Sequence, residues 1–183
     1  MCSVGINFAA SSRLIPRRYF ETDAAGLAAA IRKGQTFLGS SANTQPIQIL
    51  VDTPAPRFQK NETSVTPAWY DSLWHVVYTT AWPNNATVVE QRQAIDGVHQ
   101  SAQVLREYAP DGGAYINEAD VYEPNHEESF WGTANAARLK EIKVKYDPKN
   151  VFQVWQGIGW AGATDVRYEC YSQLNPGSAS LVN

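Results

Sequence analysis

The stretch GGAYINEADVYEP, residues 112–124, places an amide and two carboxylates directly after a short apolar run. Read as a strand, it puts Ala114, Ile116 and Glu118 on one face and Tyr115 and Asn117 on the other. A carboxyl at the edge of an apolar layer has a raised pKa and can act as a general acid or base near neutral pH. The sequence therefore predicts Glu118 as the acid/base, with Asn117 and Tyr115 as hydrogen-bond partners of a carbonyl or enol. The alternative is that the strand ends at Asn117 and the carboxylates are simply solvated.

Four further aromatic or titratable residues are candidates for binding a substrate: His75, Tyr78, Tyr122 and Trp131. His75 shares its strand face with apolar residues, so a hydrogen-bonded core histidine is the simpler interpretation. His99 lies beside the apolar stripe of a helix, and we expect it on the surface. The histidines show no i, i+4 pair and the cysteines no CxxC spacing, so we expect no metal site.

The segment GIGWAG, residues 157–162, matches the GxGxxG spacing of dinucleotide sites and follows a predicted strand. That fingerprint requires a helix that starts at the glycines and a return strand with an acidic residue. The residues that follow show no helical pattern. We therefore expect a turn here.

Composition narrows the classes of function. The chain has 183 residues, 44% of them hydrophobic, and a net charge of -3. It has no basic stripe, so we expect no nucleic-acid partner. No apolar run approaches the roughly 20 residues that span a membrane, and the first residues lack the order of a signal peptide. We therefore expect a cytoplasmic protein that does not contact membranes, with Cys2 and Cys170 as unpaired thiols.

Periodicity and capping residues predict the elements. We expect strands at 2–10, 46–51, 69–82, 114–120 and 151–155, and helices at 22–34, 87–108 and 125–147, the last interrupted at Gly132. Thr22 or Asp23 caps the first helix and Gly34 ends it in a left-handed conformation. Glu128 is placed to complete a capping box at Asn125.

The first six elements run strand, helix, strand, strand, helix, strand. This order predicts an α+β fold: a split βαβ, ferredoxin-like plait, with an antiparallel sheet, helices on one face, and an extra C-terminal helix and strand. We expect residues 1–183 to form a single unit with an irregular tail at 161–183.

Several segments carry a family resemblance. GAYINEADVYEP, FWG and RLKEIKVKYDPKNVFQVWQGIG resemble the C-terminal signature of berberine-bridge-enzyme-like FAD-linked oxidoreductases, in particular the branch of fungal secondary metabolism. SSRLIPRR and SVTPAWY also resemble the substrate domain of that family.

The resemblance implies a substrate domain that lies over a flavin ring, with Tyr115 and Asn117 facing flavin and substrate and Glu118 as acid/base. Family members carry an N-terminal FAD-binding domain, to which this sequence shows no match. The segment from Gly132 to Leu139 also departs from the family pattern by one extra residue and a missing tyrosine.

Three hypotheses follow. In the first, the domain acts without a cofactor on a small secondary-metabolite intermediate and catalyses a redox-neutral isomerisation or cyclisation, including a pericyclic closure. In the second, it is the substrate-binding part of an oxidoreductase whose FAD is supplied in trans. In the third, it is a ligand-binding remnant without catalysis. We also expect a homodimer, because the sheet face that a flavin domain covers in relatives would otherwise be bare.

Overall fold

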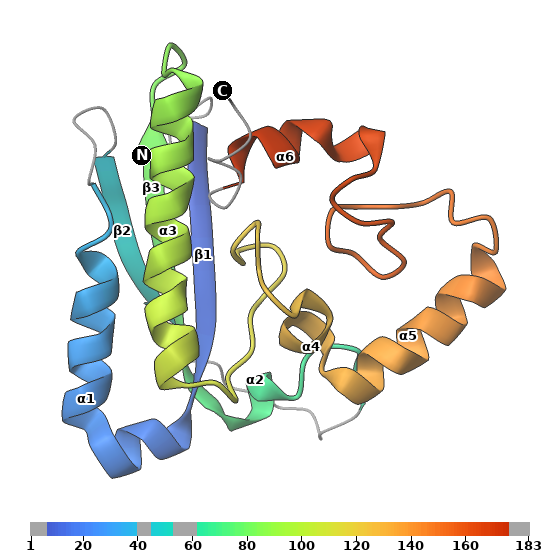
Figure 1. The fold of residues 1–183 in the computed structure, drawn as a ribbon. Helices are drawn as coiled ribbons and strands as arrows, with labels where there is room; N and C mark the ends of the chain where they lie inside the picture. The colour runs from blue at the N-terminus through green and yellow to red at the C-terminus, as the bar shows by residue number, and fades with distance from the viewer. Residues whose placement is uncertain (1–6, 40–44, 53–61, 176–183) are drawn as a thin grey trace.

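The computed structural model describes residues 7–39, 45–52 and 62–175 (Figure 1). The elements are β1 (Asn7–Pro16), α1 (Arg17–Gln35), β2 (Gln45–Asp52), α2 (Ala68–Asp71), β3 (Ser72–Trp82), α3 (Val88–Tyr108), α4 (His126–Trp131), α5 (Thr133–Tyr146), a 3-10 turn η1 (Val166–Tyr168) and α6 (Glu169–Leu174).

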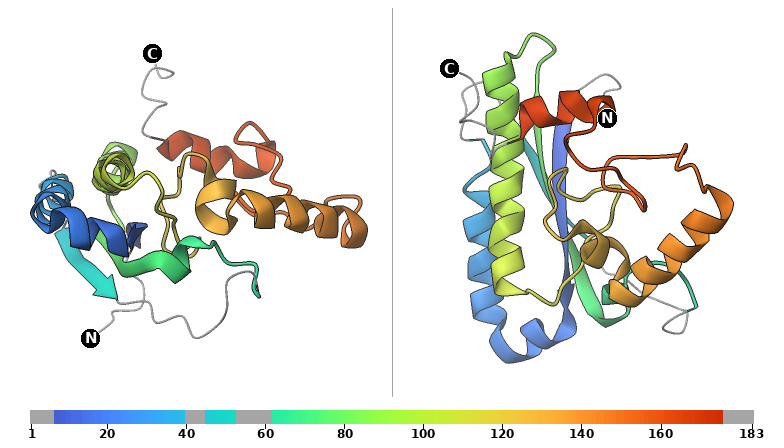
Figure 2. Two further views of the ribbon diagram at one scale, coloured as in Figure 1. Left: turned by 90° about the horizontal axis from the view of Figure 1, so that it is seen from below. Right: turned by 45° about the vertical axis from the view of Figure 1, so that its right-hand side comes forward.

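One antiparallel sheet with the strand order β1-β3-β2 forms the centre of the molecule. Helices α1 and α3 lie side by side on one of its faces (Figure 2). Alternation along β3 turns Val76 and Tyr78 toward these helices, where they join Leu27 and Leu105 in the main core. The predicted α+β class, with helices on one face of an antiparallel sheet, is confirmed.

The fourth strand of the plait does not form. Residues 114–120, predicted as a strand, run beside β1, where the backbone N–H of Leu14 donates to the carbonyl of Gly113 at 2.8 Å. Beyond that point the chain turns, because the N–H of Glu118 donates to the carbonyl of Tyr115 at 3.0 Å. The prediction of a strand at 114–120 was therefore wrong.

The strand predicted at 151–155 is also wrong. The carboxylate of Asp147 accepts the backbone N–H groups of Val151 and Phe152 at 2.8 and 2.9 Å, so these donors are not offered to a neighbouring strand. The tail, expected to be irregular, contains η1 and α6 within its described part.

The capping predictions are confirmed only in part, since α1 begins at Arg17 without a side-chain cap and not at Thr22 or Asp23. Thr87 and Glu90 form a reciprocal capping box at the start of α3. Asp23 interrupts α1 with non-helical angles, and its carboxylate accepts the N–H of Gly26 at 2.9 Å, so the predicted cap begins the second half of a kinked helix. Gly132 separates α4 from α5 at a φ of 74°, as predicted. The capping box predicted at Asn125 is absent, because that residue is left-handed with a φ of 51° and its side chain caps nothing.

Gly34 has a different role from the predicted left-handed stop, since α1 continues to Gln35. A Cβ at Gly34 would lie 2.6 Å from the hydroxyl oxygen of Tyr78 and 3.1 Å from the carbonyl oxygen of Ser101. The glycine is thus required by the close approach of α1 to α3 and the sheet.

Helix α5 extends away from the sheet (Figure 1). Its only fully buried residue is Ala136. Six large apolar residues of α5 and the segment after it are exposed: Ile142, Val144, Tyr146, Val151, Phe152 and Val154. We call these six residues the 142–154 apolar surface.

Candidate functional site

The candidate site lies on the sheet face opposite α1 and α3. His75 occupies β3 between Trp74 and Val76, both of which pack toward the helices, so alternation turns its ring to the other face. The residue is only 5% exposed. The ring of Trp69, from α2, lies 5.3 Å from the His75 ring, centroid to centroid.

The turn at 115–118 brings two predicted site residues to this histidine. The predicted alternation separates Tyr115 from Glu118, whereas the turn places both side chains beside His75. The Tyr115 ring centroid is 6.2 Å from that of His75, and Glu118 Oε2 is 3.7 Å from His75 Nδ1. Residues from two distant parts of the chain thus meet in one cluster of five, which we call the His75 cluster: Trp69, His75, Tyr115, Asn117 and Glu118.

Electrostatics keep His75 neutral at neutral pH. Burial lowers its pKa, and the negative charges of Glu118 and Asp52 offset only part of that effect. Nε2 of His75 has no hydrogen-bond partner in the described part of the chain. A buried polar atom without a partner costs free energy. This nitrogen is itself enclosed, so the groups open to a bound molecule are those of Tyr115 and Glu118.

Tyr115 and Asn117 form a directed pair at the open side of the cluster. Asn117 Nδ2 donates to the hydroxyl oxygen of Tyr115 at 2.5 Å. The phenol therefore acts as acceptor within the protein, and its O–H can donate to an oxygen of a substrate. The Glu118 side chain is 46% exposed, so its carboxylate is accessible to a bound molecule while His75 lies beneath it.

The other predicted substrate-binding residues lie elsewhere. Tyr78 is fully buried in the main core, where its hydroxyl donates to the carbonyl of Ile31 at 3.0 Å and burial raises its pKa. The hydroxyl of Tyr122 donates to the carbonyl of Tyr171 at 2.6 Å. Trp131 packs against Phe130 in a small apolar cluster under the 114–119 segment. The structure does not bring these three residues into the His75 cluster.

Tyr78→Phe tests this placement of Tyr78. We expect a loss of about 1 kcal/mol in the free energy of unfolding, the usual effect of removing one buried hydrogen bond, with ligand affinity unchanged. Urea denaturation and a ligand titration measure the two quantities. Unchanged stability together with weaker ligand binding would instead show that Tyr78 contributes to the binding site.

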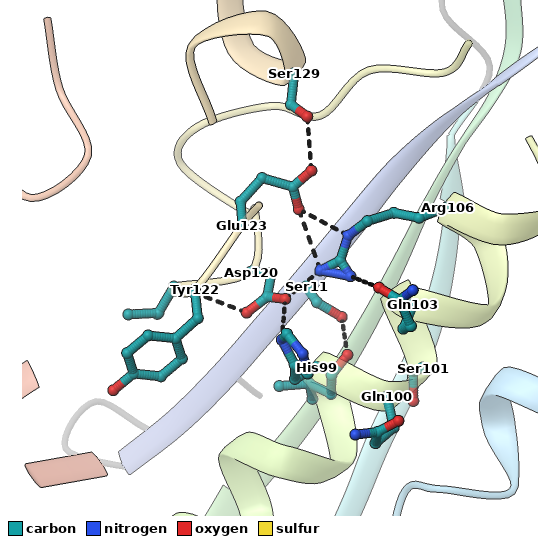
Figure 3. Close-up of polar contacts among 12 residues, drawn as sticks. Ser11, His99, Gln100, Ser101, Gln103, Arg106, Asp120, Tyr122, Glu123 and Ser129 are labelled. Atoms are coloured by element: carbon teal, nitrogen blue, oxygen red, sulfur yellow. Dashed lines mark hydrogen bonds and ion pairs between the residues drawn. The ribbon is translucent and has the colours of Figure 1, made fainter. Parts of the chain in front are cut away.

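Sequence reasoning missed a buried network of charges on the helix side of β1 (Figure 3). Glu123 accepts from Arg13 Nη1 at 2.8 Å and from the Ser129 hydroxyl at 2.7 Å, and it also pairs with Arg106. Arg106 pairs in turn with Asp120. We call these residues, together with His99, the buried charge network. Arg13, a charged residue within a buried strand between Ser12 and Leu14, was the signal in the sequence.

His99 belongs to this network and is not a surface residue as predicted. Its Nδ1 lies 2.6 Å from Asp120 Oδ2. Burial alone would raise the pKa of Asp120, but the hydrogen bond from His99 and the charges of His99 and Arg106 outweigh it and lower that pKa. Burial raises the pKa of Glu123 despite its two arginine partners.

Two classes of site receive no support from the described ranges. Among residues 7–39, 45–52 and 62–175, no group of His, Cys, Asp and Glu side chains has the arrangement of a metal site. The helices in those ranges are all too short or too polar to cross a membrane.

Comparison with known proteins shows which protein family the chain resembles. Residues 114–159 match the family "Berberine and berberine like". The similarity to FAD-linked oxidoreductases extends over most of the length of the chain. The resemblance noted in the sequence is thereby confirmed.

Two fungal relatives illustrate the similarity. The chain is 33% identical over 172 residues to the FAD-linked oxidoreductase cheF of Chaetomium globosum, a match of 91% of this chain and 27% of the relative. It is 32% identical over 153 residues to the FAD-linked oxidoreductase OXR2 of Pyricularia oryzae, 82% of this chain and 26% of the relative. The chain thus spans about a quarter of the length of these relatives.

Solved structures agree with this class. The VAO-type flavoprotein MtVAO713 of Myceliophthora thermophila C1 superposes with a TM-score of 0.68 at 26% identity, over 85% of this chain and 27% of that one. A chitooligosaccharide oxidase superposes with a TM-score of 0.64 at 23% identity, over 86% of this chain and 33% of that one, which shows the shared fold.

The relatives imply FAD, so the fit of this cofactor to the described residues matters. In one common class of dinucleotide site the pyrophosphate lies on a glycine-rich turn that opens a helix. Residues 157–162 have the glycine spacing, but Gly159 and Gly162 take positive φ values of 81° and 100° and no helix begins until η1. This segment therefore does not form that type of pyrophosphate site.

Proposed function

We propose that this chain supplies the substrate-binding and acid–base half of an FAD-linked oxidoreductase site, with the flavin held by another part of the protein or by a separate polypeptide. The observation that carries the proposal is the His75 cluster. Its aromatic and polar groups converge on the sheet face that α1 and α3 leave free, and Glu118 and Tyr115 are partly exposed there. The fungal FAD-linked relatives support the cofactor class.

The cluster can bind a substrate and move one proton. The carboxylate of Glu118 accepts a proton from an O–H or an acidic C–H of the substrate. The O–H of Tyr115, oriented by Asn117, donates a hydrogen bond to a substrate oxygen. Trp69 offers an apolar wall, and its position against His75 keeps water away from one side of the cluster.

A cofactor-free reaction is the second candidate. The proximity of His75 and Glu118 favours it, because the two groups meet within this chain and need no further component to exchange a proton with a ligand. Isomerisation or cyclisation of a small secondary-metabolite intermediate requires only such a pair and a shaped apolar surface.

Purification of the protein from its native source separates the candidates. We expect flavin absorbance to copurify with the chain, and small hydroxylated candidate substrates to yield products lighter by one pair of hydrogens. A colourless protein that converts a substrate into a product of the same mass would overturn the oxidoreductase proposal in favour of isomerisation. Ligand retention without conversion would overturn both and indicate a binding protein.

We propose in addition that the chain, when it is free of any flavin-binding part, forms a homodimer, and that its contact is the 142–154 apolar surface rather than the sheet face considered from the sequence. Exposed apolar residues gathered in one segment are typical of interaction sites. Gel filtration with light scattering is expected to report a dimer, and Phe152→Asp, which places a charge on a residue 79% exposed, is expected to yield the monomer. A monomeric wild-type chain would contradict the dimer and leave the proposed site untouched.

A further inference from the structure

The segment that carries Tyr115, Asn117 and Glu118 has no regular secondary structure of its own, so its shape depends on its two ends. At the first end, Leu14 N–H donates to Gly113 and the N–H of Ala114 donates to the carbonyl of Ser129 at 2.9 Å. The other end of the segment is Asp120, two residues beyond Glu118, and the contacts of its carboxylate determine the position of that end.

Asp120 is held by three donors from two directions. Its carboxylate receives His99 Nδ1 at 2.6 Å, the Tyr122 N–H at 2.9 Å, and the guanidinium of Arg106 (Figure 3). Only 2% of the residue is exposed. Because His99 and Arg106 belong to α3, the carboxylate fastens the loop to the most extensively packed helix of the domain.

The contact between Asp120 and Arg106 is itself supported by further ion pairs and hydrogen bonds. Arg106 also contacts Glu123, which binds Arg13 of β1 and the hydroxyl of Ser129 in α4. Buried ion pairs with several hydrogen bonds are fixed in geometry, because any displacement leaves a charge unpaired in a low-dielectric interior. The position of the 114–120 loop is therefore fixed relative to α3, β1 and α4.

We propose that Asp120, through His99 and Arg106, is a positioning residue that sets the approach of Glu118 to His75. When the Asp120 contacts are lost, the 115–118 turn moves away from β3 and the His75–Glu118 proximity is lost with it. The proposal concerns the geometry of the site named under the proposed function, and its test needs no turnover, so the two can fail separately.

The protonation midpoint of His75 reports the position of Glu118. The chain contains only three histidines, so NMR of nitrogen-labelled imidazoles follows each one through a pH titration. Burial lowers the pKa of His75, whereas the charges of Glu118 and Asp52 raise it. Removal of the charge in Glu118→Gln is therefore expected to lower the midpoint further, which calibrates the measurement.

Asp120→Asn is the decisive variant. It leaves Glu118 intact, yet we expect it to lower the His75 midpoint by the greater part of the shift that Glu118→Gln produces. In the Glu118→Gln background the same change is expected to have no further effect, because the charge that it repositions is gone. A direct electrostatic effect of Asp120 on His75 would persist in that background, so the double variant separates the two explanations.

Two controls keep the test sharp. Glu141→Gln removes an equally negative but exposed carboxylate from α5 and is expected to leave the His75 midpoint unchanged. An unchanged titration curve for His126 shows that the fold is intact. Should Asp120→Asn fail to fold, Arg106→Lys retains the positive charge while losing the planar fork, and a smaller shift in the same direction is expected. A wild-type midpoint in a folded Asp120 or Arg106 variant, or an undiminished shift in the Glu118→Gln background, overturns the proposal.

Discussion

Glu118→Gln is expected to lower turnover by about 10²- to 10⁴-fold, the usual contribution of a general acid or base. The amide matches the carboxylate in size but cannot accept the substrate proton. His75 does not replace it, because that ring is 94% buried at the side chain beneath the partly exposed Glu118. The loss is expected in kcat with little change in KM, because the proton transfer contributes to the transition state rather than to substrate binding.

Steady-state kinetics on the purified holoprotein measure this effect, with thermal denaturation to verify the fold. Glu141→Gln serves as the matched control, since it changes a carboxylate that is 68% exposed and pairs only with Arg138 on the surface of α5. A Glu118→Gln enzyme that retains the wild-type rate would show that the proton is taken by another group.

The largest expected loss of stability follows from Arg13→Met. Arg13 and Glu123 pair at 2.8 Å with side chains 4% and 0% exposed, so removal of the guanidinium leaves a buried carboxylate short of one counter-ion. Breaking such a pair costs about 3–5 kcal/mol of unfolding free energy, and the remaining contact with Arg106 places this case near the lower limit. Urea denaturation at neutral pH measures the change.

If the stability loss in Arg13→Met comes from an unpaired buried charge, two further variants have expected stabilities. Arg138→Met breaks an ion pair whose side chains are 71% and 68% exposed, and it is expected to cost less than about 1 kcal/mol. The double variant Arg13→Met, Glu123→Leu is expected to be more stable than Arg13→Met alone, because it removes the uncompensated charge. A double variant that is less stable than the single one would mean that Arg13 acts through packing.

The pH dependence of the Arg13→Met loss has a definite sign. The folded-state pKa of Glu123 is already raised by burial, and removal of a neighbouring cation raises it further. A protonated Glu123 needs no counter-ion. The stability difference between wild type and Arg13→Met is therefore expected to be largest above the raised folded-state pKa of Glu123 and to shrink as the pH falls through it.

The parts of the fold that could be read from the sequence are those set by local chemistry. Gly132 and Asp147, which precedes Pro148, lie at helix ends as predicted, because backbone restrictions act within a few residues. Alternation along β3 likewise placed His75 and Tyr78 on opposite faces of the sheet. Local patterns carry this information because capping and pleating depend on near neighbours.

The remainder of the site depends on contacts that no local pattern records. The alternation of residues 114–120 is compatible with a strand. In the structure these residues form a turn instead, since Asp120 is bound by His99 of α3 and the segment does not pair with β1 as a fourth strand. Arg13 and Glu123 are separated by 110 positions in the chain. A pairing of this kind leaves no local pattern in the sequence, so the network was missed.

The buried charge network also governs the order in which the molecule can be built. Arg13 is synthesised before Arg106, and both lack their carboxylate partners until Asp120 and Glu123 have left the ribosome. Until then, closing the sheet beneath α3 would bury two unneutralised cations. Premature compaction is thus disfavoured, and nascent chains that stop short of residue 123 are expected to remain protease-sensitive.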